Sequence, residues 1–477
     1  MPDILLVILA VVFVLGVAIN IHEFGHFIVA KMLGMRVEAY SFFGLGPRIW
    51  GFKVGNTDYR ISAIPLGAYV KLYGDEATAP LEGGSSEKPS VGEFLDQRNI
   101  GAAEEGTGAD AYFVPKEELY ELRPRWQKFL VMLGGPFMNI LLALAIPFTV
   151  AMMYGIPAMP APVVGLVTQN GAAEKAGIKP GDRIVAFDGT ENPTFDRLRK
   201  DAAILADKQV PISVERDGKR IQLTITPTRV DVSGNGLGEL DFVPDMGAEP
   251  VVVNDVVADM PAAQSGLQKG DMITAVNGKV VRNQFEVKNL ILESKGAPTT
   301  ITVSRNNEQK EVLLSPKQVS EGQWQIGIRF GNTVQDVRDP ATFATAAGFA
   351  VNSNLDILRL TGRVFGQLFS GERSVKDAGL SGPVGIVQII AQVVREAGFA
   401  GLISILTLIS LNLGVFNLLP IPLLDGGQIM VLGIEKVMSW FGKTMSMAFK
   451  EKIQFAGLAI IVLLMVFTLV LDISKLF

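Results

Sequence analysis

The chain has no cysteine and only two histidines among its 477 residues. Without cysteine it can form neither a disulfide nor a thiolate metal site, and it has no cysteine nucleophile. Charged residues make up 19% of the chain, against about 25% in soluble globular proteins. The formal net charge of −5 is spread along the chain without a long basic block. The composition therefore gives no electrostatic support to nucleic-acid binding.

Charge is missing above all from four apolar windows, each long enough to cross a bilayer, which takes about 20 residues. The windows are residues 4–29, 129–154, 398–424 and 453–471. Asp3 precedes the first window, no basic residue occurs before Lys31, and no small-residue cleavage site follows. We therefore expect a retained membrane span there rather than a signal peptide.

Basic residues lie after the first window, before the second, and between the third and fourth, for example Lys31, Arg123 and Lys443. Because cytoplasmic flanks are enriched in Lys and Arg, these three flanks are predicted to be cytoplasmic. Both termini and the long segment 155–397 would then face the opposite side of the membrane. The pattern predicts a multi-pass protein of a cytoplasmic membrane.

The segment between the first two windows contains two different patterns. Residues 40–73 combine aromatic and β-branched residues with turn-forming glycines and prolines, which predicts short strands. Their apolar character fits a β segment associated with the membrane, and a small cytoplasmic β unit fits the pattern equally well. Residues 81–110 are rich in Gly, Ser and Glu and predict a flexible acidic linker.

The long segment after the second window contains an internal repeat. "AAEKAGIKPGDRIVAFDG" at 172–189 matches "PAAQSGLQKGDMITAVNG" at 261–278 with a constant offset of 89 residues. Arg216 recurs as Arg305 at the same offset. Two homologous domains are therefore predicted, a first repeat at 158–246 and a second repeat at 247–335. The pattern resembles the PDZ domain, which binds extended peptides or chain ends, and the alternative is a pair of structural domains that bind nothing.

Both histidines fall in "HEFGH", near the end of the first window. On a helix, His22 and His26 lie four residues apart on one face, so both imidazoles can bind one metal ion. Glu23 then serves as general base, and the ligand chemistry favours zinc. HExxH also occurs by chance, and the alternative is a pair of interfacial histidines. Their place inside a span favours function, because ionisable groups are costly there.

A catalytic zinc site usually needs a third protein ligand, and without another histidine or a cysteine it must be an oxygen. Asp425 ends a run of 28 uncharged residues that begins at Ala397, which makes it the predicted third ligand. His22 lies 18 residues after Ile4, about 27 Å along a helix, near the cytoplasmic end of a core about 30 Å thick. Asp425 is predicted at the same depth.

Other polar and helix-breaking residues lie close to these positions. Asn417, Pro420 and Pro422 precede Asp425, and irregular backbone there could hold a substrate strand beside the metal, although a simple helix kink is the alternative. In "GGPFMN" at 134–139 the small residues suit close helix contact. Asn139 fits a structural hydrogen bond better than a site group.

Together these motifs resemble the site-2 protease family, the M50-type intramembrane zinc metalloproteases, and within it the bacterial group that regulates sigma-E. The resemblance rests on "HEFGH", "GGPFMN", "NLLPIPLLDGG", "LSGPVGI" and the repeat. It implies zinc held by His22, His26 and Asp425, with Glu23 as base. It also implies cleavage of single-span membrane proteins such as anti-sigma factors, after another protease has made an outer cut, with a periplasmic PDZ pair filtering substrates by size. Gln428 stands where relatives often have histidine, and no loss of catalysis is expected from it.

The predicted fold class is a polytopic α-helical membrane protein with four spans, a membrane-associated β segment and two tandem PDZ domains. Its predicted parts are a first span (1–35), a cytoplasmic region (36–128), a second span (129–155), the two repeats, a connecting segment (336–397), a third span with the metal-ligand aspartate (398–430), and a cytoplasmic loop with the fourth span (431–477). The rival functions are a membrane metal transporter, which would need an inverted helix repeat, and a non-catalytic PDZ scaffold.

Overall fold

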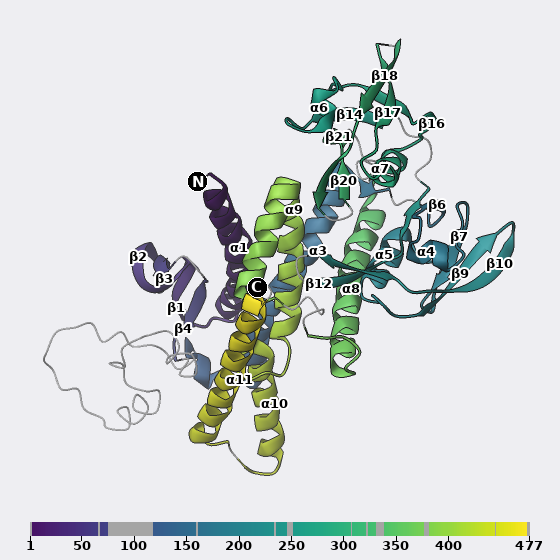
Figure 1. Ribbon diagram of the computed structural model, residues 1–477. Coiled ribbons are helices and arrows are strands. Elements are labelled where there is room, and N and C mark those ends of the chain that lie inside the picture. The colour runs from purple at the N-terminus through teal and green to yellow at the C-terminus, as the bar shows by residue number, and fades with distance from the viewer. Residues whose placement is uncertain are drawn as a thin grey trace, which may run out of the picture. The chain divides into compact units, whose positions relative to one another are not determined.

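The computed structural model describes most of the chain (Figure 1). The described residues are 2–64, 67–74, 118–158, 161–232, 235–245, 251–306, 308–320, 323–330, 338–375, 381–443 and 445–474. The predicted acidic linker at 81–110 lies outside them. The chain divides into two compact units, and each is described by itself: residues 1–151, 344–357 and 380–477 form one, and residues 152–343 and 358–379 form the other.

Long helices make up most of the first unit. They are α1 (Pro2–Met32), α3 (Arg125–Tyr154), α9 (Pro383–Asn417), α10 (Asp425–Trp440) and α11 (Met447–Ser474), and α8 (Phe343–Phe369) has residues in both units. Among the described residues, four helical stretches are long and apolar enough to cross a membrane: Ile4–Met32, Arg125–Tyr154, Ala397–Asn417 and Lys452–Ile473. The four apolar helices predicted from the sequence are thus confirmed.

Helix α9 departs from the predicted third span in two ways. Gly398 has φ 56° and ψ −142°, so the helix kinks where the span was expected to begin. Its helical backbone ends at Asn417, well before Asp425. Pro420 and Pro422 cannot continue a helix, and Leu423 takes a left-handed φ of 80°. The segment predicted as the third span, 398–430, thus contains the end of α9, a loop and the start of the separate helix α10, which Asp425 opens.

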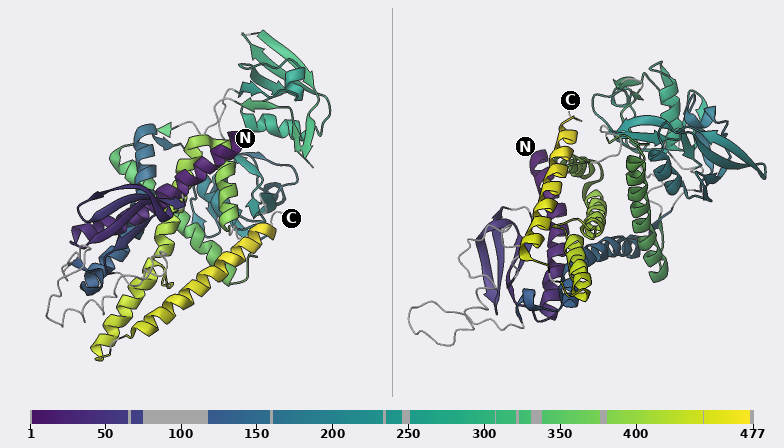
Figure 2. Two further views of the ribbon diagram at one scale, coloured as in Figure 1. Left: turned by 90° about the vertical axis from the view of Figure 1, so that its left-hand side faces the viewer. Right: turned by 90° about the horizontal axis from the view of Figure 1, so that it is seen from below.

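The predicted connecting segment 336–397 also contains more structure than expected. Helix α8 fills residues Phe343–Phe369, and the first part of α9 follows it. Ala10, Val14 and Ala18 of α1 pack on Ile390 and Val394 of α9 in one buried cluster. The two helices lie side by side in both views of Figure 2. The segment before the third apolar window thus helps to build the helical core.

A four-stranded sheet packs beside α1 (Figure 1). Its strands are β1 (Val37–Phe43), β2 (Leu45–Val54), β3 (Thr57–Ile64) and β4 (Tyr69–Leu72), in the order β2-β3-β1-β4, with β1 and β3 parallel. Phe27 of α1 stacks on Tyr40 of β1, with ring centroids 4.9 Å apart. The outer strand β2 exposes large apolar side chains, among them Ile49 (69%), Trp50 (61%) and Val54 (59%).

The second unit contains the two repeats and a short strand pair, β5 (Ile156–Pro157) with β22 (Arg338–Asp339). The first repeat comprises β6 (Val164–Val167), α4 (Ala172–Lys175), β7 (Arg183–Phe187), β8 (Thr190–Glu191), α5 (Phe195–Ala203), β9 (Val210–Arg216), β10 (Lys219–Ile225), β11 (Thr228–Val232), β12 (Asn235–Glu239) and β13 (Phe242–Pro244). The second comprises β14 (Val251–Val256), α6 (Pro261–Gln264), β15 (Met272–Val276), β16 (Lys279–Val280), α7 (Gln284–Glu293), β17 (Thr299–Arg305), β18 (Glu308–Leu314), β19 (Lys317–Ser320), β20 (Gln323–Gln325) and β21 (Ile328–Phe330).

One buried ion pair explains why aspartate and arginine recur in both repeats. In the second repeat, Arg305 donates from Nε and Nη2 to Asp271 at 2.6 and 2.7 Å, and from Nη2 to the Gly266 carbonyl at 2.9 Å. The first repeat has the same bonds between Arg216, Asp182 and the Gly177 carbonyl. Each aspartate is 1% exposed. The pair ties the turn before β7 or β15 to the strand β9 or β17.

This pair makes the stability of the second repeat depend on pH. The Arg305 hydrogen bonds lower the pKa of Asp271 against the opposing effect of burial. A depressed folded-state pKa stabilises the fold above the unfolded pKa of about 3.9, and this stabilisation is lost as the pH falls through the folded pKa. We expect Asp271→Asn to reduce the hydrogen-exchange protection of β15 and β17 at neutral pH. The difference from the unsubstituted chain should shrink in acid.

Asp255→Asn is the matched control, because the Asp255–Arg329 pair is exposed, at 57% and 72%. Exposed pairs contribute about 0–1 kcal/mol. Equal protection in the two variants at neutral pH would contradict a stabilising role for the buried pair.

Candidate metal centre

The site is built where α1 and α3 cross at very close range. A Cβ placed on Gly25 would lie 2.1 Å from the Gly134 carbonyl oxygen, so only glycine allows the two backbones to come this near. A Cβ on Gly135 would lie 2.4 Å from His26 Nε2 and 2.9 Å from His22 Cε1. Small residues at helix contacts inside membranes permit such approach. The glycines of α3 therefore form the floor under both imidazoles.

Three predicted ligands converge above this floor. His22 Nε2 lies 3.3 Å from His26 Nε2 and 3.1 Å from Asp425 Oδ2, and His26 Nε2 lies 3.4 Å from Asp425 Oδ1. A tetrahedral ion with bonds of about 2.0–2.1 Å holds its ligand atoms about 3.3–3.4 Å apart. All three side chains are at most partly exposed. The separations therefore match a small tetrahedral cation.

The polar atoms around the cluster also suit a cation. His26 Nδ1 lies 2.7 Å from the Val131 carbonyl oxygen and donates to it, which leaves the lone pair of a neutral ring on Nε2, facing His22. Asp425 Oδ2 is buried and has no hydrogen-bond partner among the described residues. In this arrangement two imidazole lone pairs and a carboxylate oxygen without a partner face one another. A cation bound between them would stabilise all three groups. The donor set of two nitrogens and one oxygen fits Zn²⁺.

Asn139 of α3, for which the sequence favoured a structural hydrogen bond over a site role, contacts the far side of His22. The amide lies 3.3 Å from His22 Nδ1, and Asn139 Oδ1 is buried without a partner. Rotating the amide by half a turn exchanges its oxygen and nitrogen. Asn139 Oδ1 then accepts from His22 Nδ1–H, which satisfies the orphaned oxygen and leaves the Nε2 lone pair facing the cluster. Such outer hydrogen bonds orient metal-binding histidines.

The loop between α9 and α10 brings Asn417 and Asp425 to the same place. Asn417, the last residue of α9, has its amide 3.2 Å from His22 Nε2. Pro420 and Pro422 lie in the loop itself, and Pro422 packs against α10, since a Cβ on Gly427 would lie 2.8 Å from Pro422 Cα. A Cβ on Gly457 of α11 would lie 2.4 Å from Pro422 Cβ, so α11 holds the loop by close contact.

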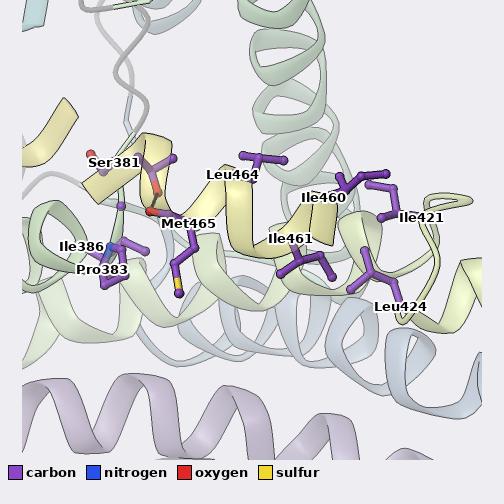
Figure 3. A pocket seen from close by; sticks show the side chains of 11 residues that line it. Ser381, Pro383, Ile386, Ile421, Leu424, Ile460, Ile461, Leu464 and Met465 are labelled. Carbon is purple, nitrogen blue, oxygen red and sulfur yellow. Dashed lines mark hydrogen bonds between the residues drawn. The ribbon is translucent and has the colours of Figure 1, made fainter. Parts of the chain in front are cut away.

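An apolar pocket lies behind this loop. Ile421 and Leu424 of the loop line it together with Ile460 and Ile461 of α11, as Figure 3 shows. Leu424 immediately precedes Asp425, and Leu423 keeps its left-handed φ of 80° beside these contacts. Non-glycine residues hold such a conformation only where the surroundings fix it. Packing against α11 therefore fixes the direction in which Asp425 enters the site.

Glu23 lies next to the cluster without being part of it. Its carboxylate interacts electrostatically with His22, His26 and Asp425, and it accepts a hydrogen bond from the backbone N–H of Val70. Val70 belongs to β4, an edge strand of the sheet with the order β2-β3-β1-β4, and β4 contacts α1. The sheet thus positions the predicted base beside the predicted ligands.

We expect Gly135→Ala to lower the zinc content of the purified protein. The added Cβ would displace His26 Nε2 and His22, both of which it would otherwise overlap. Displaced ligand geometry typically lowers metal affinity about 10–100-fold or more. Elemental analysis by mass spectrometry measures the zinc per chain. Gly348→Ala on α8 is the matched control, since a Cβ there meets nothing within 4 Å. Equal zinc in both variants would contradict the geometry.

Asn139→Ala should weaken zinc binding about 10–100-fold, the usual effect of losing an outer hydrogen bond to a ligating histidine. Competition with a chelator of known affinity measures the change. The control is Asn354→Ala, because Asn354 is a buried amide that donates to the Ala143 carbonyl at 3.0 Å, away from the cluster. If both variants kept wild-type affinity, Asn139 would be a structural residue only.

Comparison with known proteins places this geometry in a family. The model of peptidase family M50 matches residues 10–464. The regulator of sigma-E protease RseP of Escherichia coli K12 is 30% identical over 482 residues, which cover 97% of each chain. The regulator of sigma E protease of Salmonella typhi is 29% identical over 98% of each chain. A Vibrio cholerae protein provisionally named a zinc metalloprotease is 30% identical over 92% of each chain.

Two solved structures are similar to a part of the chain. The PDZ domains of two SdrC-like proteins, from Listeria monocytogenes and Listeria innocua, are 25% and 28% identical. They cover 17% and 18% of this chain and 86% and 97% of their own, with TM-scores of 0.16 and 0.17.

The matched family spans nearly the whole chain, and the relatives and the four apolar helices indicate a bacterial membrane protein. The chain belongs to peptidase family M50, and it is a metalloprotease.

Proposed function

We propose that the protein is an intramembrane zinc endopeptidase that cleaves single-span membrane proteins. The observation that carries the proposal is that His22 and His26, with Glu23 between them on a helix long enough to span a bilayer, meet Asp425. A site on such a helix serves a peptide bond that lies in or near the membrane. Relatives named regulator of sigma-E protease support anti-sigma-factor-like substrates, trimmed first by another protease.

His22, His26 and Asp425 would hold the zinc, with Asn139 and the Val131 carbonyl fixing the two rings. Bound zinc supplies Lewis-acid polarisation of the scissile carbonyl and of the attacking water. Glu23 takes a proton from that water and later gives it to the leaving amine. The hydrogen bond that the Val70 N–H donates to Glu23 orients the Glu23 carboxylate. Asn417, 3.2 Å from His22 Nε2, is within reach of a substrate carbonyl held beside the cluster.

The substrate must be extended before it can be cut, because a helix hides its carbonyls in hydrogen bonds. Strand β4 is an edge of its sheet and touches the base, so an unwound substrate could pair with it. The loop with Pro420 and Pro422 follows Asn417 in the chain, and its carbonyl groups are free of helical hydrogen bonds. The exposed apolar side chains of β2 suit a sheet that rests in lipid.

We place the protein in the bacterial inner membrane with four spans, its metal centre near the cytoplasmic face and its two repeats in the periplasm. The Lys and Arg flanks of the spans support this orientation. The repeats would be tandem PDZ domains that meet periplasmic peptides or exclude bulky proteins. The constant offset of their motifs and the shared ion pair support their common origin.

Glu23→Gln separates this function from a transporter or a scaffold. We expect the purified variant to cleave a single-span reporter, with its outer domain removed, about 10²–10⁴-fold more slowly, the usual contribution of a general base. Its zinc content should be unchanged, since Glu23 is not a ligand. Gel analysis of the reporter and elemental analysis measure the two quantities.

Glu308→Gln on the exposed strand β18 is the matched control and should cleave at the wild-type rate. Cleavage by Glu23→Gln at the wild-type rate would remove the base from the mechanism. Zinc without any cleavage by the unsubstituted chain would favour a non-catalytic scaffold.

A further inference from the structure

Helix α11 is fixed to the rest of the first unit at two points where glycine allows very close contact. At one of them, a Cβ on Gly457 would lie 2.4 Å from Pro422 Cβ, in the loop between α9 and α10. At the other, the Asp472 carboxylate accepts hydrogen bonds from the Gly382 N–H at 2.9 Å and from the Gly385 N–H at 2.8 Å. Gly457 and Asp472 lie 15 residues apart, about 22 Å along the helix.

The contact at Asp472 is a helix cap supplied by another helix. Gly382 is the N-cap residue of α9 and offers no side chain to the free N–H groups of the first turn. The Asp472 carboxylate, 4% exposed, satisfies two of these groups, and the helix dipole favours its negative charge there. A Cβ on Gly385 would lie 2.8 Å from Asp472 Oδ1, so a side chain would displace the carboxylate. The end of α11 is therefore held against the start of α9.

Between its two fixed points α11 leaves a slot. The slot is the apolar pocket behind the loop, with a volume of about 360 Å³, and the start of α9 forms its other end (Figure 3). Helix α11 lines the slot with Ile460, Ile461, Leu464, Met465 and Thr468, a spacing that places all five on one helix face. These residues cover about 12 Å of the helix. Because α11 is held on both sides of the slot, the slot is a built feature of the fold.

The lining of the slot suits hydrocarbon. Of the eleven described residues that line it, none is charged, and only Ser381 and Thr468 carry a hydroxyl. The Thr468 hydroxyl already donates to the Met465 carbonyl at 3.0 Å. A bound water needs two to four polar partners, which this lining does not offer. Helix α11 is apolar enough to cross a membrane, so the surroundings that it meets there are hydrocarbon.

Size separates the two forms of hydrocarbon that a bilayer can present, an apolar helix and a lipid acyl chain. An α-helix with its side chains is about 10–12 Å across. A length of 12 Å of such a helix would fill about 1,000 Å³, nearly three times the volume of the slot. One leaflet is half of a core about 30 Å thick, so an acyl chain extends over about 15 Å. The slot thus fits a single acyl chain and is too small for a helix.

The loop that carries Asp425 forms one end of the slot. Ile421 and Leu424 lie beside Ile460 and Ile461 there (Figure 3), and Leu424 directly precedes Asp425. An empty apolar gap deprives the side chains around it of contacts. A chain in the slot restores these contacts to Ile421 and Leu424. It therefore packs against the segment that sets the direction of Asp425.

We propose that the slot between α11, the loop and the start of α9 binds one acyl chain of a membrane phospholipid, and that this chain holds the loop in place by packing against Ile421 and Leu424. In the proposed orientation the loop lies toward the cytoplasmic side and Asp472 toward the opposite side. The chain then belongs to a lipid of the outer leaflet, with its methyl end at the loop. The inference rests on the proposed membrane placement and is independent of the proposed peptide hydrolysis.

The test asks whether one lipid stays bound when the bulk bilayer is removed. The full chain is reconstituted into vesicles of dioleoylphosphatidylcholine, extracted into mild detergent, and weighed intact by native mass spectrometry. We expect about one phospholipid per chain. Leu464→Trp and Met465→Trp, which fill the slot, should each lower the retained lipid at least tenfold. Leu463→Trp is the matched control, because Leu463 is 73% exposed on α11 and does not line the slot.

The control variant should keep its lipid as the unsubstituted chain does. A chain that retains no lipid overturns the proposal, and so does equal retention by all three tryptophan variants. Unchanged hydrogen exchange in α1 and α3 checks that each variant folds. Since neither zinc nor cleavage is measured, a chain that keeps its lipid but cuts no reporter would contradict the proposed function alone.

Two further measurements test the effect on the loop and the identity of the occupant. The Leu424 N–H donates to the Ile421 carbonyl at 3.1 Å, and the Gln428 N–H donates to the Leu424 carbonyl at 3.1 Å. These amides should exchange about tenfold more slowly with the lipid retained than after its removal, and equal exchange overturns the role in holding the loop. An excess of the single-span reporter, added to Glu23→Gln so that it is not cut, should leave the lipid bound. Displacement of the lipid by the reporter, one for one, would assign the slot to substrate and overturn the proposal.

Discussion

The first unit depends on the close approach of the α1 and α3 backbones at Gly25 and Gly134. Every feature of the metal centre depends on it, because side chains reach only a few ångströms beyond their helices. The approach brings the Val131 carbonyl and the Asn139 amide within hydrogen-bonding distance of the two imidazoles. No hydrophobic driving force brings apolar helices together in lipid, because lipid tails are as apolar as the helices. Helix contact there depends on close packing and on hydrogen bonds. Here Gly25 and Gly134 permit the close packing, and the two histidines make the hydrogen bonds between the helices.

The meeting of the two imidazoles could be predicted from spacing alone, since His22 and His26 must share a helix face. Asp425 could be inferred because it ends a run of 28 uncharged residues at the depth expected for the histidines. Its local structure could not, because the left-handed Leu423 and the contact of Pro422 with Gly457 depend on tertiary packing. The same holds for Asn139, whose contact with His22 joins residues 117 positions apart. Helix α8 was missed because it lacks a long apolar run, although it adds Asn354 to the helical core.

The repeats show a different limit of sequence comparison. The positions that revealed the duplication, such as Asp182 with Asp271 and Arg216 with Arg305, belong to turns and to a buried ion pair. Folding requires them in both copies. The edge strands carry no such requirement, so Asp241 and Pro244 can occupy one copy while Gly327 and Phe330 occupy the other. Two domains can thus share a core and a motif and still differ at their edge strands.

Strand β2 has a surface that would promote aggregation in water. It is the outer edge of its sheet, and it exposes Trp50 and neighbouring apolar side chains along its length. In water, a long apolar edge with unpaired backbone groups is a template for the edge of another sheet, and it leads to aggregation. The sheet that positions Glu23 therefore cannot be detached as a soluble piece. Lipid, detergent or a bound chain must cover β2 to keep the sheet from pairing with the sheet of another molecule.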